Sequence, residues 1–306
     1  MKAESAPATD NPGFALPEPF LGWFASRGWQ PRAHQLELLS ETAAGRSMLL
    51  IAPTGAGKTL AGFLPSLTEL AARGKPKPGS AGARSLHTLY ISPLKALAVD
   101  IERNLARPVE EMGLPVRIET RTGDTPQSKR ARQRTDPPDI LLTTPEQVSL
   151  LIANTHAERL FAGLRYVIFD ELHSLIASKR GHLLSLALAR LRKLAPGLRT
   201  IGLSATVADP EELQRWLVPQ SRLTDERAGR ITVAGGASPI ITILESEERI
   251  PWSGHSARYA IPDVYQTIKD HRTTLIFVNT RSQAELLFQE LWRINDDSLP
   301  IALHHG

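Results

Sequence analysis

Two segments constrain the fold of this 306-residue chain most strongly, and they lie more than a hundred residues apart. The first, Ala52-Pro-Thr-Gly-Ala-Gly-Lys-Thr59, has the glycine spacing of a loop that turns backbone N–H groups around phosphate oxygens before a helix. The second, Asp170-Glu-Leu-His173, follows the apolar run Tyr166–Phe169 with two adjacent carboxylates. The loop alone predicts that a nucleoside triphosphate is bound. The carboxylates add a partner for Mg²⁺ and a base for water, so together the segments predict a hydrolase.

Each polar residue of the two segments has an expected role. Lys58 would bridge the β- and γ-phosphates, and the Thr59 hydroxyl would coordinate Mg²⁺. Asp170, at the end of its strand, would hold the same Mg²⁺ through water, and Glu171 would orient and deprotonate the attacking water. The loop residues expected to bind ATP are Thr54, Gly55, Ala56, Gly57, Lys58 and Thr59.

A third segment, Ser204-Ala-Thr206, follows a later strand. Its two hydroxyls could hydrogen-bond His173, which would then sense the nucleotide state and relay it. Ser and Thr are also common turn formers at strand ends, so the segment alone is weak evidence for chemistry.

Composition excludes several classes of site and partner. The chain has no cysteine, which excludes disulfides, thiol nucleophiles and zinc sites with Cys ligands. No run approaches the roughly 18 apolar residues that a membrane span needs, so we expect a cytoplasmic protein without a membrane partner. The net charge of +4 is weak evidence for a polyanionic partner. The basic run at residues 129–134 is either a solvated helix face or an aid to binding a nucleic-acid strand.

Short apolar runs alternate with helical segments along most of the chain. Strands are predicted at residues 47–52, 88–92, 116–120, 140–143, 166–170 and 200–204. Strands that recur between helices indicate an α/β fold, with a parallel sheet covered by helices on both faces. Near-continuous apolar strands are what such a doubly covered sheet requires.

The same pattern predicts the domain organisation. Residues 1–19 are expected to be a disordered leader, and residues 20–230 the ATP-binding domain. Residues 231–306 are expected to begin a second α/β domain, with strands at 231–233, 240–244, 274–278 and 300–303 and a helix over 282–294. Two units are few for an independent sheet, so we expect this second domain to be truncated.

Further short motifs carry a resemblance to a known family. They are Pro31-Arg-Ala-His-Gln35, Ser92-Pro-Leu-Lys-Ala-Leu97, Arg121-Thr-Gly-Asp124, Thr143-Thr-Pro-Glu146, Leu275-Ile-Phe-Val-Asn-Thr-Arg281 and His304-His-Gly306. With the phosphate loop and Asp170–His173, they resemble the motifs of superfamily 2 DEAD/DEAH-type helicases, whose domains are RecA-like. The combination is most similar to Lhr-like helicases, and residues 24–35 resemble the bacterial ligase-associated DEXH-box type.

The resemblance implies a function and further site residues. It implies an ATP-dependent DNA helicase or translocase that uses ATP and Mg²⁺, acts in DNA repair and has a repair ligase or nuclease as partner. Gln35 would recognise adenine. The nucleic-acid backbone would meet Pro93, Lys95, Gly123 and Thr144, in short loops past strand ends that suit phosphate contacts better than base contacts.

Three alternatives remain at this stage. RNA could replace DNA, because motifs that contact the backbone are largely shared. The chain could also be an ATP- and nucleic-acid-binding module with little hydrolysis, since the family's motifs V and VI, with their arginine fingers, normally follow the last residue here. A small-molecule kinase fits poorly, because no arginine-rich lid segment is evident.

Overall fold

The computed structural model describes residues 16–74, 85–205, 207–221, 225–235, 240–244 and 258–304. The chain divides into two compact units, Met1–Gly236 and Ala237–Gly306. Most of the leader expected at 1–19 lies outside the described residues, but Leu16 is only 2% exposed and belongs to the core of the first unit. Among the described residues, no helix is both long and apolar enough to cross a bilayer.

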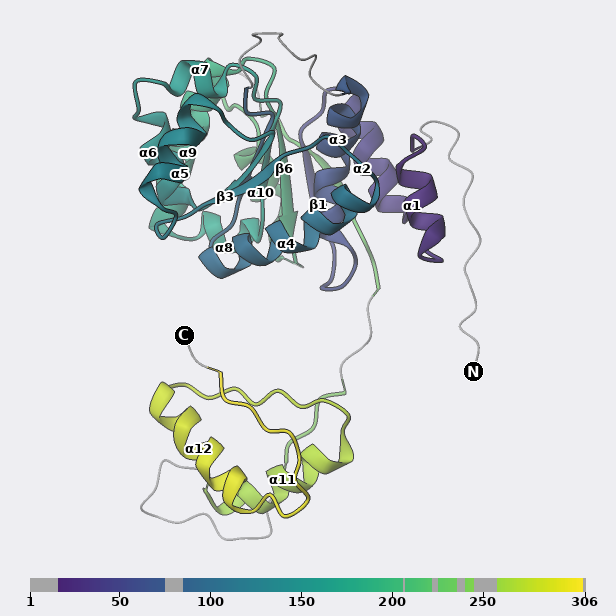
Figure 1. The fold of residues 1–306 in the computed structure, drawn as a ribbon, viewed down its shortest axis with the longest axis vertical. Coiled ribbons are helices and arrows are strands. Elements are labelled where there is room, and N and C mark those ends of the chain that lie inside the picture. Colours follow the sequence, from purple (N-terminus) through teal and green to yellow (C-terminus); the bar gives the residue numbers. More distant parts are fainter. Residues whose placement is uncertain are drawn as a thin grey trace. The chain divides into compact units, whose positions relative to one another are not determined.

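Within the described part of the first unit, seven strands form one parallel sheet (Figure 1). The strands are β1 (Met48–Ile51), β2 (Thr88–Ile91), β3 (Ile118–Arg121), β4 (Ile140–Thr143), β5 (Tyr166–Phe169), β6 (Arg199–Ser204) and β7 (Gly229–Thr232). Their order across the sheet is β3-β4-β2-β5-β6-β1-β7, and all neighbours run parallel. The carboxyl ends of all strands therefore lie along one edge, where ligands bind in open α/β sheets.

Two helices precede β1, and the others connect the strands of the first unit. They are α1 (Phe20–Ser26), α2 (Ala33–Ala43), α3 (Lys58–Arg73), α4 (Lys95–Glu111), α5 (Gln127–Thr135), α6 (Pro145–Ile152), α7 (Ala157–Phe161), α8 (Leu172–Ile176), α9 (Lys179–Leu194) and α10 (Pro210–Trp216). The predicted α/β fold, with helices on both faces of a parallel sheet, is confirmed.

Alternate residues of β1, β2, β4 and β5 enter two separate cores. In β1, Met48 and Leu50 pack with residues of α1 to α4, whereas Leu49 and Ile51 pack with residues of α6 to α10. This alternation follows from the two-residue period of a strand, and it explains why these four strands are apolar on both faces. The sheet is thus covered on each side, and its carboxyl edge is left for the functional loops.

The strand β7 spans the expected domain boundary between residues 230 and 231. It pairs with β1 along Met48–Ile51, so it completes the sheet of the first unit. The chain leaves this unit only at Gly236.

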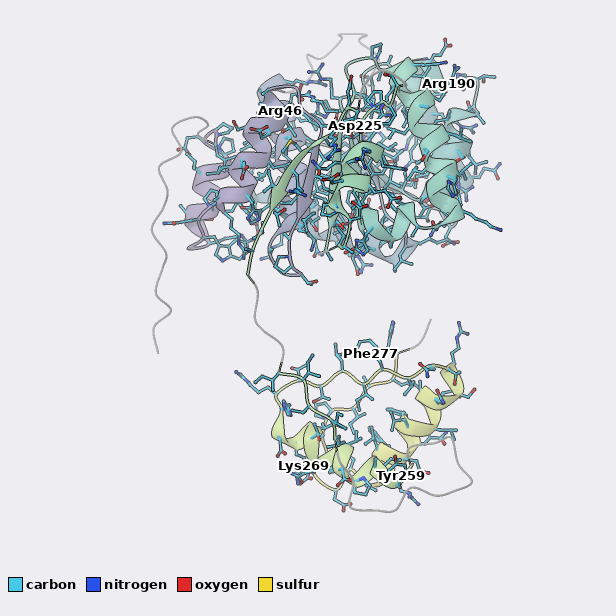
Figure 2. The ribbon with its side chains drawn as sticks, turned by 180° about the vertical axis from the view of Figure 1, so that it is seen from behind. Arg46, Arg190, Asp225, Tyr259, Lys269 and Phe277 are labelled. Carbon is cyan, nitrogen blue, oxygen red and sulfur yellow. The ribbon has the colours of Figure 1, made fainter. Side chains whose placement is uncertain are left out.

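The second unit contains a 3₁₀ turn (Arg258–Ala260) and the helices α11 (Ile261–Asp270) and α12 (Arg281–Arg293). The prediction of strands at 240–244, 274–278 and 300–303 is wrong, since the structure describes these residues and none of them is in a strand. A strand forms only where its backbone groups pair with a neighbour, and a β-rich composition cannot supply one. Phe277 accordingly lies on an extended segment with its side chain 88% exposed (Figure 2).

Candidate active site

The predicted phosphate loop connects β1 to α3 at the carboxyl edge of the sheet. Gly55 and Gly57 have φ angles of +78° and +76°, a left-handed conformation that favours glycine. Gly57 is the N-cap of α3, so the loop leads directly into a helix N-terminus. The fold thus provides the N–H groups and the helix dipole that favour phosphate binding.

The ammonium group of Lys58 lies across this loop. It donates hydrogen bonds to the carbonyl oxygens of Ala52 at 2.6 Å and Pro53 at 3.2 Å. Lys58 is partly buried, and burial raises the pKa of Asp170 while the nearby positive charge of Lys58 opposes that rise. The loop lysine and the strand-end carboxylate are therefore brought together, although β6 separates their strands.

Residues at the start of α2 form hydrogen bonds with the backbone of the phosphate loop. Nη1 of Arg32 donates to the carbonyl oxygen of Gly55 at 3.1 Å, and Nε2 of His34 lies 3.0 Å from that of Ala56. Burial is the main cause that lowers the pKa of His34, so the ring is neutral at pH 7 and Nε2–H is the donor. The motif predicted to contact the base thus also fixes the backbone of the loop.

Gln35 makes the third of these contacts. Its Nε2 donates to the carbonyl oxygen of Gly57 at 3.4 Å, and its Oε1 accepts from the backbone N–H of Arg32 at 2.9 Å. A Cβ added at Gly57 would lie 2.9 Å from the same Nε2. That atom is the end of a flexible side chain, which can shift, so the φ angle of Gly57 is the main reason for a glycine here.

Asp170 follows β5 and is buried. The Tyr90 hydroxyl, from the neighbouring strand β2, donates a hydrogen bond to its Oδ2, and the backbone N–H of Glu171 donates to its Oδ1 at 3.1 Å. Burial raises the pKa of Asp170, while the Tyr90 hydrogen bond and the Lys58 charge oppose that shift. The carboxylate is thus held in one orientation by a residue that sequence reasoning did not identify.

Glu171 is the N-cap of α8 and has φ 46° and ψ 47°, a left-handed conformation that is uncommon for a residue with a side chain. Its carboxylate is 39% exposed and lies 3.5 Å from Nε2 of His173. Such strained residues are frequent in active sites. The conformation leaves the Glu171 carboxylate accessible to water, as the role predicted for it requires.

His173 and Ser204 are brought together as predicted. Nδ1 of His173 lies 2.8 Å from the Ser204 hydroxyl oxygen, across the gap between α8 and the end of β6. The other expected partner, Thr206, lies outside the described residues. One hydrogen bond therefore links the segment after β5 to the segment after β6.

A pocket of about 340 Å³ lies beside the phosphate loop. Residues from α1 and the segment after it, from the start of α3 and from α4 line it, among them Trp23, Trp29, Gly57, Thr59 and Asn104. Arg27 lies close to both indole rings, with its guanidinium carbon 5.1 Å from the Trp23 ring centre and 5.5 Å from that of Trp29. This aromatic wall was not predicted; the signal for it was Trp29, a large apolar residue next to the Pro31–Gln35 motif.

The residues expected to meet nucleic acid lie past the ends of β2, β3 and β4. Nζ of Lys95 is 3.2 Å from Asp124 and would be 3.3 Å from a Cβ at Gly123, so these two loops lie side by side. Pro93 is partly buried, and Thr144 is the buried N-cap of α6. All four positions share the sheet edge with the phosphate loop.

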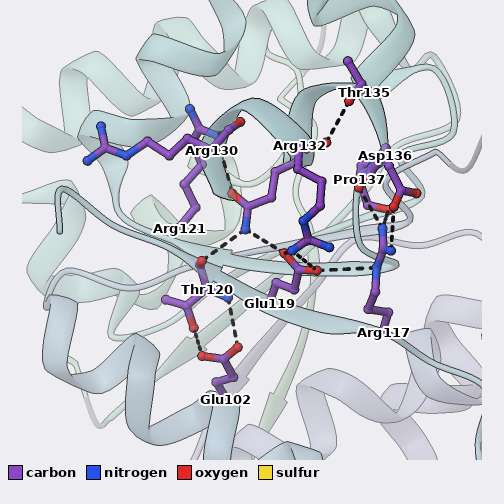
Figure 3. Close-up of polar contacts among 11 residues, drawn as sticks. Glu102, Arg117, Glu119, Thr120, Arg121, Arg130, Arg132, Thr135, Asp136 and Pro137 are labelled. Carbon is purple, nitrogen blue, oxygen red and sulfur yellow. Dashed lines mark hydrogen bonds and ion pairs between the residues drawn. The ribbon is translucent and has the colours of Figure 1, made fainter. Parts of the chain in front are cut away.

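The basic run on α5 has a structural role at two of its positions. Arg132 donates to both carboxylate oxygens of Glu119 at 2.9 Å (Figure 3). Arg130 donates to the carbonyl oxygen of Thr125 at 2.6 Å and to that of Gly123. These arginines hold α5 and the Gly123 loop against the edge strand β3, so they are not part of a purely solvated face.

The residues present fit a nucleotide-bound Mg²⁺ better than a metal held by protein alone. Among the described residues, no group of three or more His, Asp or Glu side chains could hold an ion. Mg²⁺ keeps several waters and commonly binds through one or two protein oxygens and substrate phosphates. Thr59 and Asp170, in the loop after β1 and at the end of β5, match that limited donor set.

Comparison with known proteins finds helicases, among them Lhr-like helicases at 33–40% identity. The family model described as DEAD/DEAH box helicase matches residues 32–214. A protein of Mycolicibacterium smegmatis, named Lhr helicase/probable uracil glycosylase, is 37% identical over 302 residues, which cover 93% of this chain and 19% of that protein. An ATP-dependent helicase Lhr-Core of Methanothermobacter thermautotrophicus is 40% identical over 263 residues, covering 81% of this chain and 30% of that protein.

A solved structure agrees with these matches. The Mycobacterium smegmatis helicase Lhr bound to ssDNA and AMP-PNP superposes with a TM-score of 0.73 at 33% identity, covering 92% of this chain and 36% of that one. This chain spans less than a third of the length of the two curated relatives above. Because the family model covers more than half of the chain, this protein belongs to the DEAD/DEAH box helicase family, and its relatives are Lhr-like helicases.

Proposed function

We propose that the protein containing this chain is an ATP-dependent DNA helicase or translocase. The observation that carries the proposal is the shared sheet edge. The Lys58 loop and Asp170–Glu171 lie there with the short loops that contain Pro93, Lys95, Gly123 and Thr144. A movement of the hydrolytic residues can therefore shift the neighbouring loops directly, because all of them lie at the same edge of the sheet.

The roles of the hydrolytic residues follow from their contacts. Lys58 would exchange the carbonyl oxygens of Ala52 and Pro53 for phosphate oxygens, which are stronger acceptors for an ammonium group. Thr59 and Asp170 would hold Mg²⁺, Asp170 through water, and the bound ion would supply a counter-charge for the phosphates. Glu171 would accept the proton of the attacking water, and His173 would pass the change to Ser204.

We assign the nucleotide base to the pocket of about 340 Å³ beside the phosphate loop. Trp23 and Trp29 line this pocket, and Trp29, which is 54% exposed, can contact an aromatic base, while Gly57 and Thr59 connect the pocket to the phosphate site. Gln35 would recognise adenine, since its long hydrogen bond to Gly57 can be exchanged for one to the base edge.

DNA is the proposed nucleic acid, and a role in repair with a ligase or nuclease partner is part of the same proposal. Support for DNA comes from the Lhr structure named above, which contains ssDNA, and from the relative whose name includes a probable uracil glycosylase. RNA is the alternative within the same class. Competition between DNA and RNA strands of matched sequence distinguishes them, and tighter binding of RNA would favour the alternative.

The test is the nucleic-acid-stimulated ATPase activity of the full-length protein. We expect Lys58→Ala to abolish ATP binding, and Glu171→Gln to lower turnover by at least about 100-fold while ATP still binds. Arg190→Ala, on the exposed face of α9, is the matched control and should retain the activity of the wild type (Figure 2). Unchanged stimulated turnover in both site variants would contradict the proposal.

A further inference from the structure

Arg180, in the first turn of α9, joins two of the loops proposed to meet nucleic acid. Its Nη1 donates to the carbonyl oxygen of Pro93 at 2.8 Å. Its Nε and Nη2 donate to the two carboxylate oxygens of Glu146 at 2.5 Å and 3.1 Å. Pro93 follows β2, and Glu146 lies in the first turn of α6 after β4. One guanidinium group therefore spans the ends of two neighbouring strands.

The Glu146 carboxylate is a strong acceptor in this arrangement. Burial opposes its ionisation, but hydrogen bonds from Arg180 and the Thr144 hydroxyl keep its pKa below the usual value. Two parallel N–H···O bonds fix both distance and orientation, which a single point charge does not. Arg180 is thereby connected through Glu146 to Thr144 and directly to Pro93.

The start of α9 is in turn fixed to the segment that carries the hydrolytic residues. Ser178 donates to the carbonyl oxygen of Leu175 at 2.8 Å and accepts from the backbone N–H of Gly181 at 3.3 Å. A Cβ at Gly181 would overlap the Leu175 carbonyl oxygen and lie 2.8 Å from that of Ile176. The first turn of α9 therefore packs tightly on the end of α8, whose N-cap is Glu171.

We infer that Arg180 is a positioning residue that couples the hydrolytic end of β5 to the loops at Pro93 and Thr144. A shift of α8 with nucleotide state would move the first turn of α9, and Arg180 would carry both loops with it. The inference rests on the proposed function, because it needs these loops to contact nucleic acid. Spatial continuity alone does not demonstrate coupling, so the coupling itself must be measured.

The experiment compares the affinity of the full-length protein for a single-stranded DNA oligonucleotide with and without a non-hydrolysable ATP analogue. The ratio of the two dissociation constants is the coupling between the sites. We expect Arg180→Ala to move this ratio roughly tenfold towards unity, as loss of a charge-assisted pair predicts. Analogue affinity without DNA should stay at the wild-type value.

Arg180→Lys tests whether the forked geometry matters. Lysine keeps the positive charge but cannot reach three acceptors in the same plane, so it should lower the coupling as alanine does. Glu146→Gln should have a similar effect, and combining it with Arg180→Ala should add little because both remove the same interaction. Arg190→Ala, on the same helix, should leave the coupling unchanged.

The possible outcomes distinguish a failure of the proposed function from a failure of the inference about Arg180. Failure of the wild-type protein to bind the oligonucleotide would refute the proposed function itself. Wild-type coupling that persists in Arg180→Ala, or that Arg180→Lys fully restores, would overturn the inference about Arg180. A parallel loss of thermal stability and analogue affinity would also overturn it, because Arg180 would then serve the fold alone.

Discussion

The hydroxyl of Tyr90, in the middle of β2, donates a hydrogen bond to Oδ2 of Asp170 at the end of β5. Both residues are buried, and burial raises the pKa values of the Tyr90 hydroxyl and of the Asp170 carboxyl group. Tyr90 therefore remains a protonated donor at neutral pH. Its hydrogen bond favours the charged form of Asp170 and fixes the oxygen that points away from the backbone of Glu171.

Replacing Tyr90 by Phe removes this donor without changing the packing of the ring. We expect the first unit to lose about 1–3 kcal/mol of unfolding free energy, because a buried carboxylate oxygen loses its partner. The concentration of Mg²⁺ needed for half-maximal ATP binding should rise, because Asp170 is less well oriented. Thermal unfolding and a Mg²⁺ titration measure the two effects. Tyr259→Phe, in the second unit, is the control, and equal behaviour of the two variants would contradict the assignment (Figure 2).

His34 offers a test of the support beneath the phosphate loop. His34→Ala removes the donor to the Ala56 carbonyl oxygen, and ATP affinity should fall about fivefold, the effect of roughly 1 kcal/mol. His34→Gln can still donate and should lie closer to the wild type. Isothermal titration calorimetry at pH 7 gives both values. An affinity of His34→Ala equal to that of the wild type would show that the loop does not need this contact.

The parts of the site that sequence predicted are those encoded by local spacing. The glycines of the phosphate loop and the adjacent Asp170 and Glu171 each occupy one short segment, and the apolar runs before them mark the strands. Pairing along the sheet then follows from the parallel α/β pattern. The proximity of Lys58 to Asp170 was predictable for that reason.

Contacts between distant segments could not be predicted in this way. Tyr90 contacts Asp170 across 80 positions, and Arg180 contacts Pro93 across 87. Nothing in either local sequence distinguishes these side chains from an ordinary core tyrosine or surface arginine. The strand predicted over 274–278 fails for the opposite reason: its local composition is correct, but strand formation depends on a partner that composition does not specify.

His87 predicts how stability depends on pH. It is fully buried at the amino end of β2, and burial is the main cause that lowers its pKa from 6.5 to about 4, with Arg73, Arg165 and Arg199 adding to the shift and Glu69 opposing it. Because the unfolded chain binds this proton more readily, stability should be intact above pH 6.5 and fall as the pH drops from 6.5 to 4. The expected loss is about 3 kcal/mol.

Urea denaturation of the wild type and of His87→Gln at several pH values tests whether His87 causes the loss of stability in acid. The variant cannot take up the proton, so its stability should vary less between pH 6.5 and 4 than that of the wild type. His182→Gln, at an exposed position on α9, should keep the wild-type dependence. If the unfolding free energies of the wild type and of His87→Gln changed equally with pH, the acid sensitivity would come from other groups.

Gly181 tests the junction of α8 and α9. Alanine normally stabilises a helix relative to glycine, by up to about 1 kcal/mol, so an exposed helical site would gain from Gly181→Ala. Here the added Cβ would overlap the Leu175 carbonyl oxygen, a backbone atom that cannot rotate away. We therefore expect the opposite sign, a loss of about 1–3 kcal/mol, as overpacking predicts. Thermal unfolding beside Ser185→Ala, later in the same helix, measures the difference, and a Gly181→Ala protein as stable as the wild type would mean that α8 and α9 are not tightly joined.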